Sequence, residues 1–260
     1  MAWSAAILVS LVLPGCTAPA TPPSSAAPAK LAPHAAESDR RARIRLELAA
    51  GYYQAGQYPV ALSEVAQALA AEPSNAEAYG LQGLILMAMQ DWKAAQASFD
   101  QVLVLQPNEP NTLHNIGWLQ CEQGRYAQGI AELERAMATP RYGAQARSVM
   151  AKAMCQRRSG DLTGAEESFF KAYEMDAGNP VIAYHLGDLL FRRQDLERAR
   201  FHLRRLNKSE YANAESLWLG IRVERAVGDT AAMRQLADQL QRRYPDSKEW
   251  QRYEQGAFSG

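Results

Sequence analysis

Residues 115–137 read NIGWLQCEQGRYAQGIAELERAM and carry the pattern that decides the fold. Apolar residues recur at helical spacing from Ile116 until Gly124 interrupts them, and a second apolar stripe begins at Tyr126. The pattern predicts two short helices joined by a glycine turn, with Gly117 allowing the helices to approach closely. A helical hairpin of this size cannot bury its own apolar face, so it requires neighbours of the same kind.

The hairpin pattern repeats from Ala42 onward with a period of 34 residues, and the first unit shows Tyr52, Gly56, Ala61 and Pro73 at the characteristic positions. The pattern resembles the tetratricopeptide repeat (TPR), in which small residues lie where helices cross, aromatic residues wedge between hairpins and a proline ends the second helix. An insertion within residues 140–145 lengthens the third unit. The predicted units are 42–75, 76–109, 110–145, 146–179, 180–213 and 214–247. The resemblance implies an all-α fold, a right-handed superhelix of six TPR hairpins, with a concave groove lined mainly by first helices.

The end of the repeat region has the features of a cap. The sixth unit is the poorest match, with Thr230 and Met233 at positions that are usually apolar and small. The following residues 248–258 contain Trp250 and Tyr253 three positions apart, which predicts a short helix that seals the last apolar face. We therefore assign residues 40–258 to one TPR domain with a C-terminal capping segment.

The N-terminus resembles that of a bacterial lipoprotein. Residues 1–15 form an apolar run of signal-peptide length that is too short to span a bilayer. The run ends in LPGC, which resembles a lipobox, where a signal peptidase cuts before a cysteine that then carries the lipid. No Lys or Arg precedes the run and Pro14 is unusual in a lipobox, so an ordinary signal peptide with an incidental cysteine is the alternative. We expect lipidation of Cys16, because this cysteine stands where the apolar run stops.

Residues 16–39 are assigned to the lipidated cysteine and a tether rich in Ala, Pro, Ser and Thr, a composition that cannot bury a core. Thr17 follows the cysteine at the place where, in many bacteria, Asp signals retention in the inner membrane. The resemblance therefore implies a lipid anchor in the outer membrane, on its periplasmic face.

Composition and motifs argue against several classes of function. Lys+Arg and Asp+Glu each number 28, so the formal net charge is +0 and gives no electrostatic case for nucleic-acid binding. We find no phosphate-binding glycine loop, no nucleophile elbow and no metal-ligand spacing among the four histidines. His114 and His185 are interpreted as surface or groove side chains. The sequence thus predicts a protein that is not an enzyme and that has no catalytic residue, metal, cofactor or small-molecule substrate.

Cys121 and Cys155 are predicted to lie in the first helices of the third and fourth units. Neighbouring first helices pack together in stacked repeats, so the two sulfur atoms are candidates for a disulfide, which an oxidising periplasm permits. The alternative is that both residues are small, buried apolar side chains.

Protein binding is the output that this architecture favours. By resemblance to other TPR proteins, certain first-helix positions contact a partner, and they lack the Lys and Asn set that clamps a peptide carboxylate in some family members. The positions predicted to line a partner-binding groove are Leu46, Tyr53, Leu84, Met87, His114, Trp118, Met154, Tyr184 and Phe191. The N-terminal half of this set is apolar and suits an amphipathic helix or an extended apolar segment. We expect about half of the candidate side chains to pack against the next helix instead.

Three stretches narrow the resemblance further: LHNIGWLQCEQGRYAQGIAELERAM at 113–137, ATPRYGAQARSVMAKAMCQRRSGDLTGAEESFFKAYEMD at 138–176 and YPDSKEWQRYEQGAF at 244–258. Together with the N-terminal features they resemble the type IV pilus biogenesis lipoproteins of the PilF/PilW type, which are pilotins. The resemblance implies an outer-membrane lipoprotein that binds the pilus secretin subunit and promotes its localisation and multimer assembly. It also implies that Cys121 and Cys155 are paired. The alternatives are a TPR scaffold lipoprotein, or a periplasmic chaperone or regulator, that serves another envelope machine.

Overall fold

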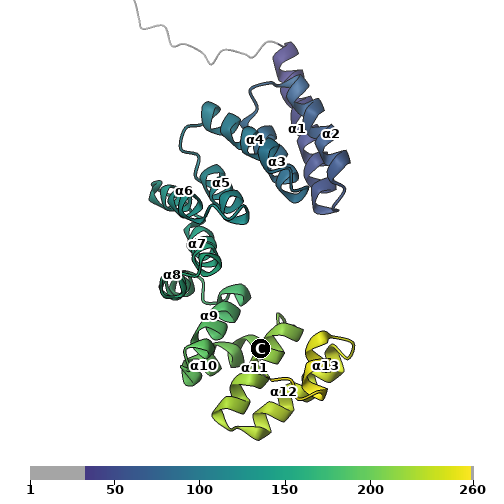
Figure 1. The fold of residues 1–260 in the computed structure, drawn as a ribbon. Coiled ribbons are helices and arrows are strands. Elements are labelled where there is room, and N and C mark those ends of the chain that lie inside the picture. Colours follow the sequence, from purple (N-terminus) through teal and green to yellow (C-terminus); the bar gives the residue numbers. More distant parts are fainter. Residues whose placement is uncertain (1–32, 259–260) are drawn as a thin grey trace, which may run out of the picture.

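The computed structural model describes residues 33–258, and within this range the secondary structure is entirely α-helical. Consecutive helices pack pairwise, and the pairs stack into an open arc whose two ends carry α1 and α13 (Figure 1). This arrangement is the predicted all-α superhelix of TPR hairpins. The helices of the described range are α1 (Pro33–Gln54), α2 (Tyr58–Ala71), α3 (Ala76–Ala88), α4 (Trp92–Leu105), α5 (Pro110–Glu122), α6 (Tyr126–Ala138), α7 (Gln145–Ser159), α8 (Leu162–Met175), α9 (Pro180–Arg192), α10 (Leu196–Asn207), α11 (Ala214–Val227), α12 (Thr230–Arg243) and α13 (Lys248–Glu254).

Helix α1 begins earlier than the sequence predicts. We assigned residues 16–39 to a tether, whereas residues 33–39 already belong to α1. Pro33 stands at the first helical position, where its missing N–H leaves no hydrogen bond unmade. The residues after it are mostly Ala, Glu and Arg, which are strong helix formers. The predicted boundary at residue 39 is therefore wrong by about two helical turns, and the predicted lipidation site Cys16 lies outside the described residues.

The two helices of a hairpin meet where a small residue of the first faces a large residue of the second. A Cβ built on Gly83 would lie 2.4 Å from the Phe99 ring, and one on Gly187 would lie 2.6 Å from Leu203 Cγ. Large side chains therefore enter the space that the missing Cβ leaves open. Corresponding pairs within the same buried clusters are Ala49 with Val65, Ala153 with Phe169 and, with the sizes exchanged, Ile221 with Ala237. In the sixth unit, which matches the repeat pattern least, the large residue stands on the first helix and the small one on the second. The two side chains together still fill a volume similar to that of the other pairs.

The same period of 34 residues sets the ends of the helices. Four second helices begin with an aspartate whose carboxylate accepts a hydrogen bond from a backbone N–H three residues later, namely Asp91, Asp161, Asp195 and Asp229. The turns before α8 and α12 contain glycines with positive φ, Gly160 and Gly228, and Gly56 and Gly124 take the same place before α2 and α6. Short capped turns of this kind hold the two helices of a unit antiparallel.

The two ends of the arc differ. At the C-terminal end, α13 places Trp250 and Tyr253 against a cluster that contains Trp218 and Leu240, and Phe258 packs on the same cluster. At the N-terminal end, Ile44 and Leu48 of α1 stay exposed, because no preceding hairpin covers them among the described residues. No helix between residues 33 and 258 is long and apolar enough to cross a membrane.

We predict that Gly117→Ala destabilises the domain by about 1–3 kcal/mol, the usual cost of overpacking a core. The new methyl group would lie 2.7 Å from Leu133 Cγ and 2.8 Å from the carbonyl oxygen of Gly129, and the backbone oxygen cannot move aside alone. Gly51→Ala is the matched control, because no atom lies within 4 Å of its built Cβ, and alanine at this helical position should stabilise by up to about 1 kcal/mol. Urea unfolding followed by circular dichroism measures both. Equal changes in unfolding free energy for the two variants, in the same direction, would contradict the close crossing of α5 and α6.

Candidate partner-binding groove

The inner side of the arc is formed by first helices. In Figure 1, α5, α7, α9 and α11 lie on the inner side, and α6, α8, α10 and α12 lie on the outer side. Most of the residues predicted to contact a partner keep part of their side chains accessible while the rest packs against a buried cluster. These half-buried residues are Tyr53, Leu84, Met87, Trp118, Met154, Tyr184 and Phe191. These side chains therefore offer accessible apolar area that the fold already holds in place.

Two of the predicted groove residues are buried and cannot form part of a binding surface. Leu46 is 5% exposed and belongs to the stripe of α1 that contains Ala42 and Ala49. This stripe packs on α2, so Leu46 serves the core of the first hairpin. His114 is 8% exposed, because the residues that follow α6 cover it. The interpretation of these two positions as groove contacts is therefore wrong.

His114 belongs to a buried polar cluster built around the insertion between the third and fourth units. Its Nδ1 lies 2.8 Å from the Oγ atom of Ser148 in α7, and the same Oγ atom lies 3.0 Å from the hydroxyl of Tyr142. Tyr142 stands in the connection between α6 and α7 and is itself buried. Burial, with a smaller contribution from the charge of Arg147, lowers the pKa of His114 to about 4, so its ring is neutral at pH 7.

His185 is mostly buried, and it is one of the residues that line the cavity between α7, α9, α11 and the α13 region. It is 9% exposed, and its ring centroid lies 5.2 Å from that of Phe169 and 5.3 Å from that of Tyr184. Burial, and next the charge of Arg157, lowers the pKa of His185 to about 4. Neither histidine has the surroundings of a metal ligand, and the described residues contain no group of three or more His, Cys, Asp or Glu that could hold a metal ion.

The centre of the groove combines an aromatic ring with a charge. The guanidinium carbon of Arg158 lies 4.9 Å from the centre of the Trp118 ring, within cation–π distance. The Nη1 atom of Arg158 also forms an ion pair with Glu122 at 2.7 Å. The predicted groove residues before Trp118 are mostly apolar, whereas charged side chains lie beside Trp118 itself.

Cys121 and Cys155 are joined by a disulfide in the structure, and their Cα atoms lie 5.6 Å apart. Both residues are buried, beside Leu133 and Ala151. The bond links α5 to α7, so it connects the first helices of the third and fourth units directly. A Cβ built on Gly129 would lie 2.5 Å from Cys121 Sγ, which places the bond next to the close crossing of α5 and α6.

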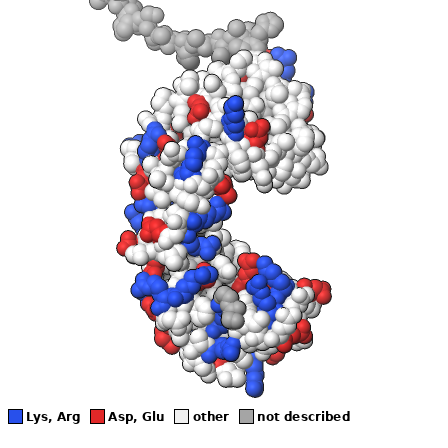
Figure 2. All heavy atoms as spheres, viewed as in Figure 1, with Lys and Arg blue, Asp and Glu red and all other residues white. Residues whose placement is uncertain are grey.

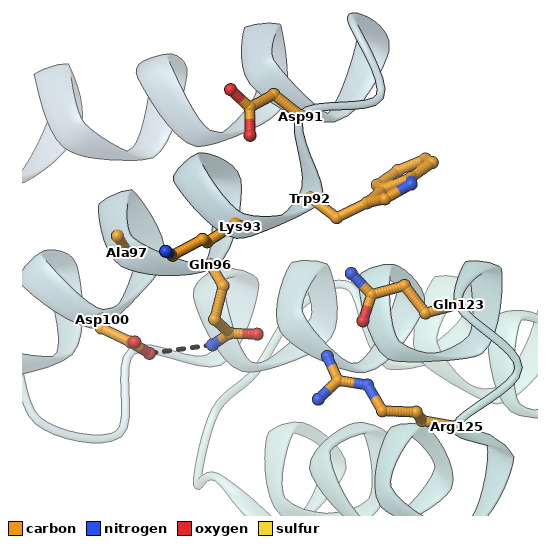
Figure 3. A pocket seen from close by; sticks show the side chains of 8 residues that line it. All are labelled: Asp91, Trp92, Lys93, Gln96, Ala97, Asp100, Gln123 and Arg125. Carbon is orange, nitrogen blue, oxygen red and sulfur yellow. Dashed lines mark hydrogen bonds between the residues drawn. The ribbon is translucent and has the colours of Figure 1, made fainter.

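A recess that the sequence did not indicate lies outside the groove, between α4 and the turn before α6 (Figure 3). Its volume is about 700 Å³, and Trp92, Lys93 and Arg125 are among its lining residues. On one side of the recess, Gln96 Nε2 donates a hydrogen bond of 2.8 Å to Asp100, one turn further along α4. The recess is open to solvent and is lined by charged, polar and apolar side chains. These side chains do not form an arrangement for acid–base or nucleophilic chemistry.

A second cavity that the sequence analysis missed lies in the C-terminal half of the groove, between α7, α9, α11 and the α13 region. It is lined by Trp218 and Arg222 of α11, among others. Trp218 stands 34 positions after Tyr184, so carrying the groove positions forward by one more repeat would have found it.

Helix pairs stacked into an arc define a helical-repeat protein. Models of the tetratricopeptide repeat match residues 46–110 and 114–180, and a further TPR model matches residues 156–218, so the matches cover more than half of the chain. The chain belongs to the tetratricopeptide-repeat family.

Individual relatives narrow this assignment to a type of TPR protein. The chain is 26% identical over 209 residues to the type IV pilus assembly protein PilF of Pseudomonas aeruginosa. The aligned residues make up 80% of this chain and 83% of the relative. A solved structure of Pseudomonas aeruginosa PilF superposes with a TM-score of 0.74 at 25% identity, covering 85% of this chain and 99% of PilF. The structure of PilW, described as a widely conserved type IV pilus biogenesis factor, gives a TM-score of 0.73 at 25% identity, covering 82% of this chain and 97% of PilW. This chain is a TPR protein of the PilF/PilW type.

We predict that the stability contributed by His114 is lost as the pH falls from about 6.5 to 4. The neutral ring is favoured in the folded state, so between these values the unfolded chain binds a proton that the folded chain does not. The unfolding free energy should therefore decrease with falling pH by up to about 1.4 kcal/mol per pH unit through this residue. His114→Asn removes the titration, and the stability difference between wild type and variant should shrink from pH 7.5 to pH 5. A difference that is independent of pH would contradict the buried neutral ring.

We also predict that the Cys16→Ala variant, purified without reductant and denatured, contains no reactive thiol, because Cys121 and Cys155 are joined. Reduction should then lower the unfolding free energy by about 4 kcal/mol, as expected for a cross-link that closes a loop of this length. Ellman titration and thermal unfolding with and without reductant measure the two effects. Two reactive thiols in the oxidised sample would show that the pair is not bonded.

Proposed function

We propose that this protein is an outer-membrane lipoprotein required for type IV pilus biogenesis, and that it acts as a pilotin. In this role it binds the pilus secretin subunit and promotes the localisation and multimer assembly of the secretin. It acts by binding and not by catalysis. The observation that carries the proposal is the similarity to the type IV pilus assembly protein PilF over four fifths of the chain, joined by a similar fold in PilW.

The groove supplies the specificity in this proposal. Tyr53, Leu84 and Met87 present half-buried apolar surface on α1 and α3, and Trp118 continues it on α5. A secretin segment that lays an apolar face on these side chains removes them from water, at a gain of about 25 cal/mol per Å² of apolar surface. Because each side chain is already fixed on one flank by the core, little conformational entropy is lost when the partner binds. An amphipathic helix or an extended apolar segment fits this surface.

The lipid supplies the membrane affinity. Acyl chains on Cys16 would hold the protein at the periplasmic face of the outer membrane without a membrane-spanning helix. Since α1 begins at Pro33, the proposed tether between the anchor and the first helix consists of residues 17–32. In polyproline geometry these residues would reach about 50 Å. The domain could then bind a secretin subunit at some distance from the bilayer while it stays anchored.

We predict that Met87→Glu lowers the recovery of secretin with the tagged protein at least tenfold. A carboxylate in an apolar groove must lose its hydration when the partner binds, and it gains no counter-charge in return. Val104→Glu is the matched control, because Val104 is 71% exposed on the second helix α4 and the substitution makes the same chemical change outside the groove. Pull-down from detergent-solubilised outer membranes, with circular dichroism of each purified variant, provides the measurement.

A second arm uses Cys16→Ala in cells. The variant should leave the secretin mislocalised and poor in multimers, whereas the purified repeat domain should unfold at the same temperature as the wild type. Normal secretin multimers in these cells would refute the role of the lipid. Recovery of a different envelope protein in place of secretin, by wild type and Val104→Glu alike, would favour a scaffold or chaperone for another envelope machine.

A further inference from the structure

The exposed face of α10 carries a large apolar side chain where the other second helices carry small or polar ones. Phe201 is 60% exposed, and α10 lies on the outer side of the arc (Figure 1). The residues at the equivalent position of the other units, all of them exposed, are Ser63, Ala97, Ala131, Glu167 and Gln235. The repeat pattern therefore does not require an aromatic ring at this place, and aromatic residues are enriched in protein interfaces.

Phe201 is the most exposed member of a group of rings that spans α8 and α10. Its ring centre lies 5.2 Å from that of His202, which is 5% exposed. The His202 ring lies in turn 4.8 Å from that of Tyr173 and 6.1 Å from that of Phe170, both on α8. We call these four residues the outer aromatic patch. Because the Phe201 ring already packs on one side, little side-chain entropy is lost when another surface covers it.

Opposite charges stand at equal distances on the two sides of Phe201. Glu197 precedes it by four residues and Arg205 follows it by four, and both side chains are exposed. Four residues correspond to about 6 Å along a helix and keep the three side chains on one face. Nη1 of Arg205 donates a hydrogen bond of 3.0 Å to the Tyr173 hydroxyl, which holds the guanidinium beside the outer aromatic patch.

This arrangement is complementary to itself. When two copies of α10 lie antiparallel across a two-fold axis at Phe201, the two Phe201 rings meet on the axis. Glu197 of each copy then faces Arg205 of the other, as a symmetric contact between identical surfaces requires. A parallel arrangement would bring Glu197 to Glu197 and Arg205 to Arg205, and such like-charge contacts are unfavourable. The charges therefore select one orientation.

Two further arginines stand three residues before and three residues after the central phenylalanine, and both are already paired within the chain. Arg198 lies over the Phe170 ring, 4.5 Å from its centre, and 3.3 Å from Asp195. Arg204 Nε donates to Glu224 of α11 at 2.6 Å. The first therefore leans toward α8 and the second toward α11, on opposite flanks of α10.

The surroundings of α10 do not repel a second copy. Figure 2 shows Lys and Arg mixed with Asp and Glu along the outer margin of the arc, the side on which Figure 1 places α8 and α10. A margin of mixed sign has no large field of one charge that would keep two copies apart.

We propose that the exposed face of α10, centred on Phe201, binds a second copy of this chain in a symmetric antiparallel dimer. A contact made through one helix face buries less area than the ~1,600 Å² of a standard interface, so the dimer is weak and reversible. The inner side of the arc stays accessible in this dimer, because α10 lies on the outer side. The proposal does not depend on which partner the groove binds.

Sedimentation velocity of the purified Cys16→Ala protein tests the proposal without association through acyl chains. We expect the weight-average sedimentation coefficient to rise with protein concentration, from that of a monomer toward that of a dimer. Phe201→Ser introduces the residue that the first unit has at this position, and it should weaken self-association at least tenfold because the central contact is lost. Phe201 is exposed, so the replacement leaves the core intact, and circular dichroism checks the fold.

Charge reversal tests the antiparallel register. Glu197→Arg and Arg205→Glu each place like charges opposite one another twice in the dimer, so each variant alone should associate at least tenfold more weakly. An equimolar mixture of the two variants should associate as strongly as the wild type, because both contacts across the axis again join opposite charges. Arg242→Glu is the matched control, since Arg242 is exposed on α12 outside the outer aromatic patch, and its reversal should leave association unchanged.

Several results would overturn the proposal. The protein could stay monomeric up to about 1 mM, a concentration at which even weak specific contacts form. Phe201→Ser could leave association unchanged, or the mixture of charge-reversed variants could fail to restore it although each variant is folded. A monomeric protein whose Phe201→Ser variant loses a different protein from a pull-down would assign the outer aromatic patch to that partner and not to a second copy. None of these results bears on recovery of secretin through the groove.

Discussion

The contact between a small residue of one helix and a large residue of the next holds this structure together. It recurs from Gly83 and Phe99 to Gly187 and Leu203, and in each hairpin it brings two helix backbones close enough to exclude water. A hairpin closed in this way still leaves one apolar face uncovered, which the following hairpin buries. The arc, its inner side and the groove are consequences of repeating this contact at an interval of 34 residues.

The groove that results is divided in character. Half-buried apolar side chains line the part formed by α1, α3 and α5, and charged side chains line the part formed by α7, α9 and α11. The disulfide between Cys121 and Cys155 lies at the boundary, beside the cation–π contact of Arg158 with Trp118. A partner that spanned both parts would contact apolar side chains at one end and charged side chains at the other.

Sequence alone was sufficient for the features that depend on local repetition. The hairpins, their turns and the capping helix follow from the spacing of residues. The errors fall where burial is decided by residues outside the repeat pattern. His114 looked accessible because its cover, Tyr142, comes from an insertion without a counterpart in other units. The start of α1 was misplaced because an Ala-rich segment suits a helix as well as a tether. The cavity between α7, α9, α11 and the α13 region was missed because the groove positions were not carried into the sixth unit.

The bond between Cys121 and Cys155 also changes how the domain carries mechanical load. It joins positions 34 residues apart, so tension along the chain passes from one sulfur to the other without stretching α6. An extended chain gains about 3.3 Å per residue, and the closed loop therefore withholds about 110 Å from the maximum length of the oxidised protein. When the two ends of the domain are pulled apart, the outer hairpins can be drawn out fully, while the middle of the arc keeps the third and fourth units together.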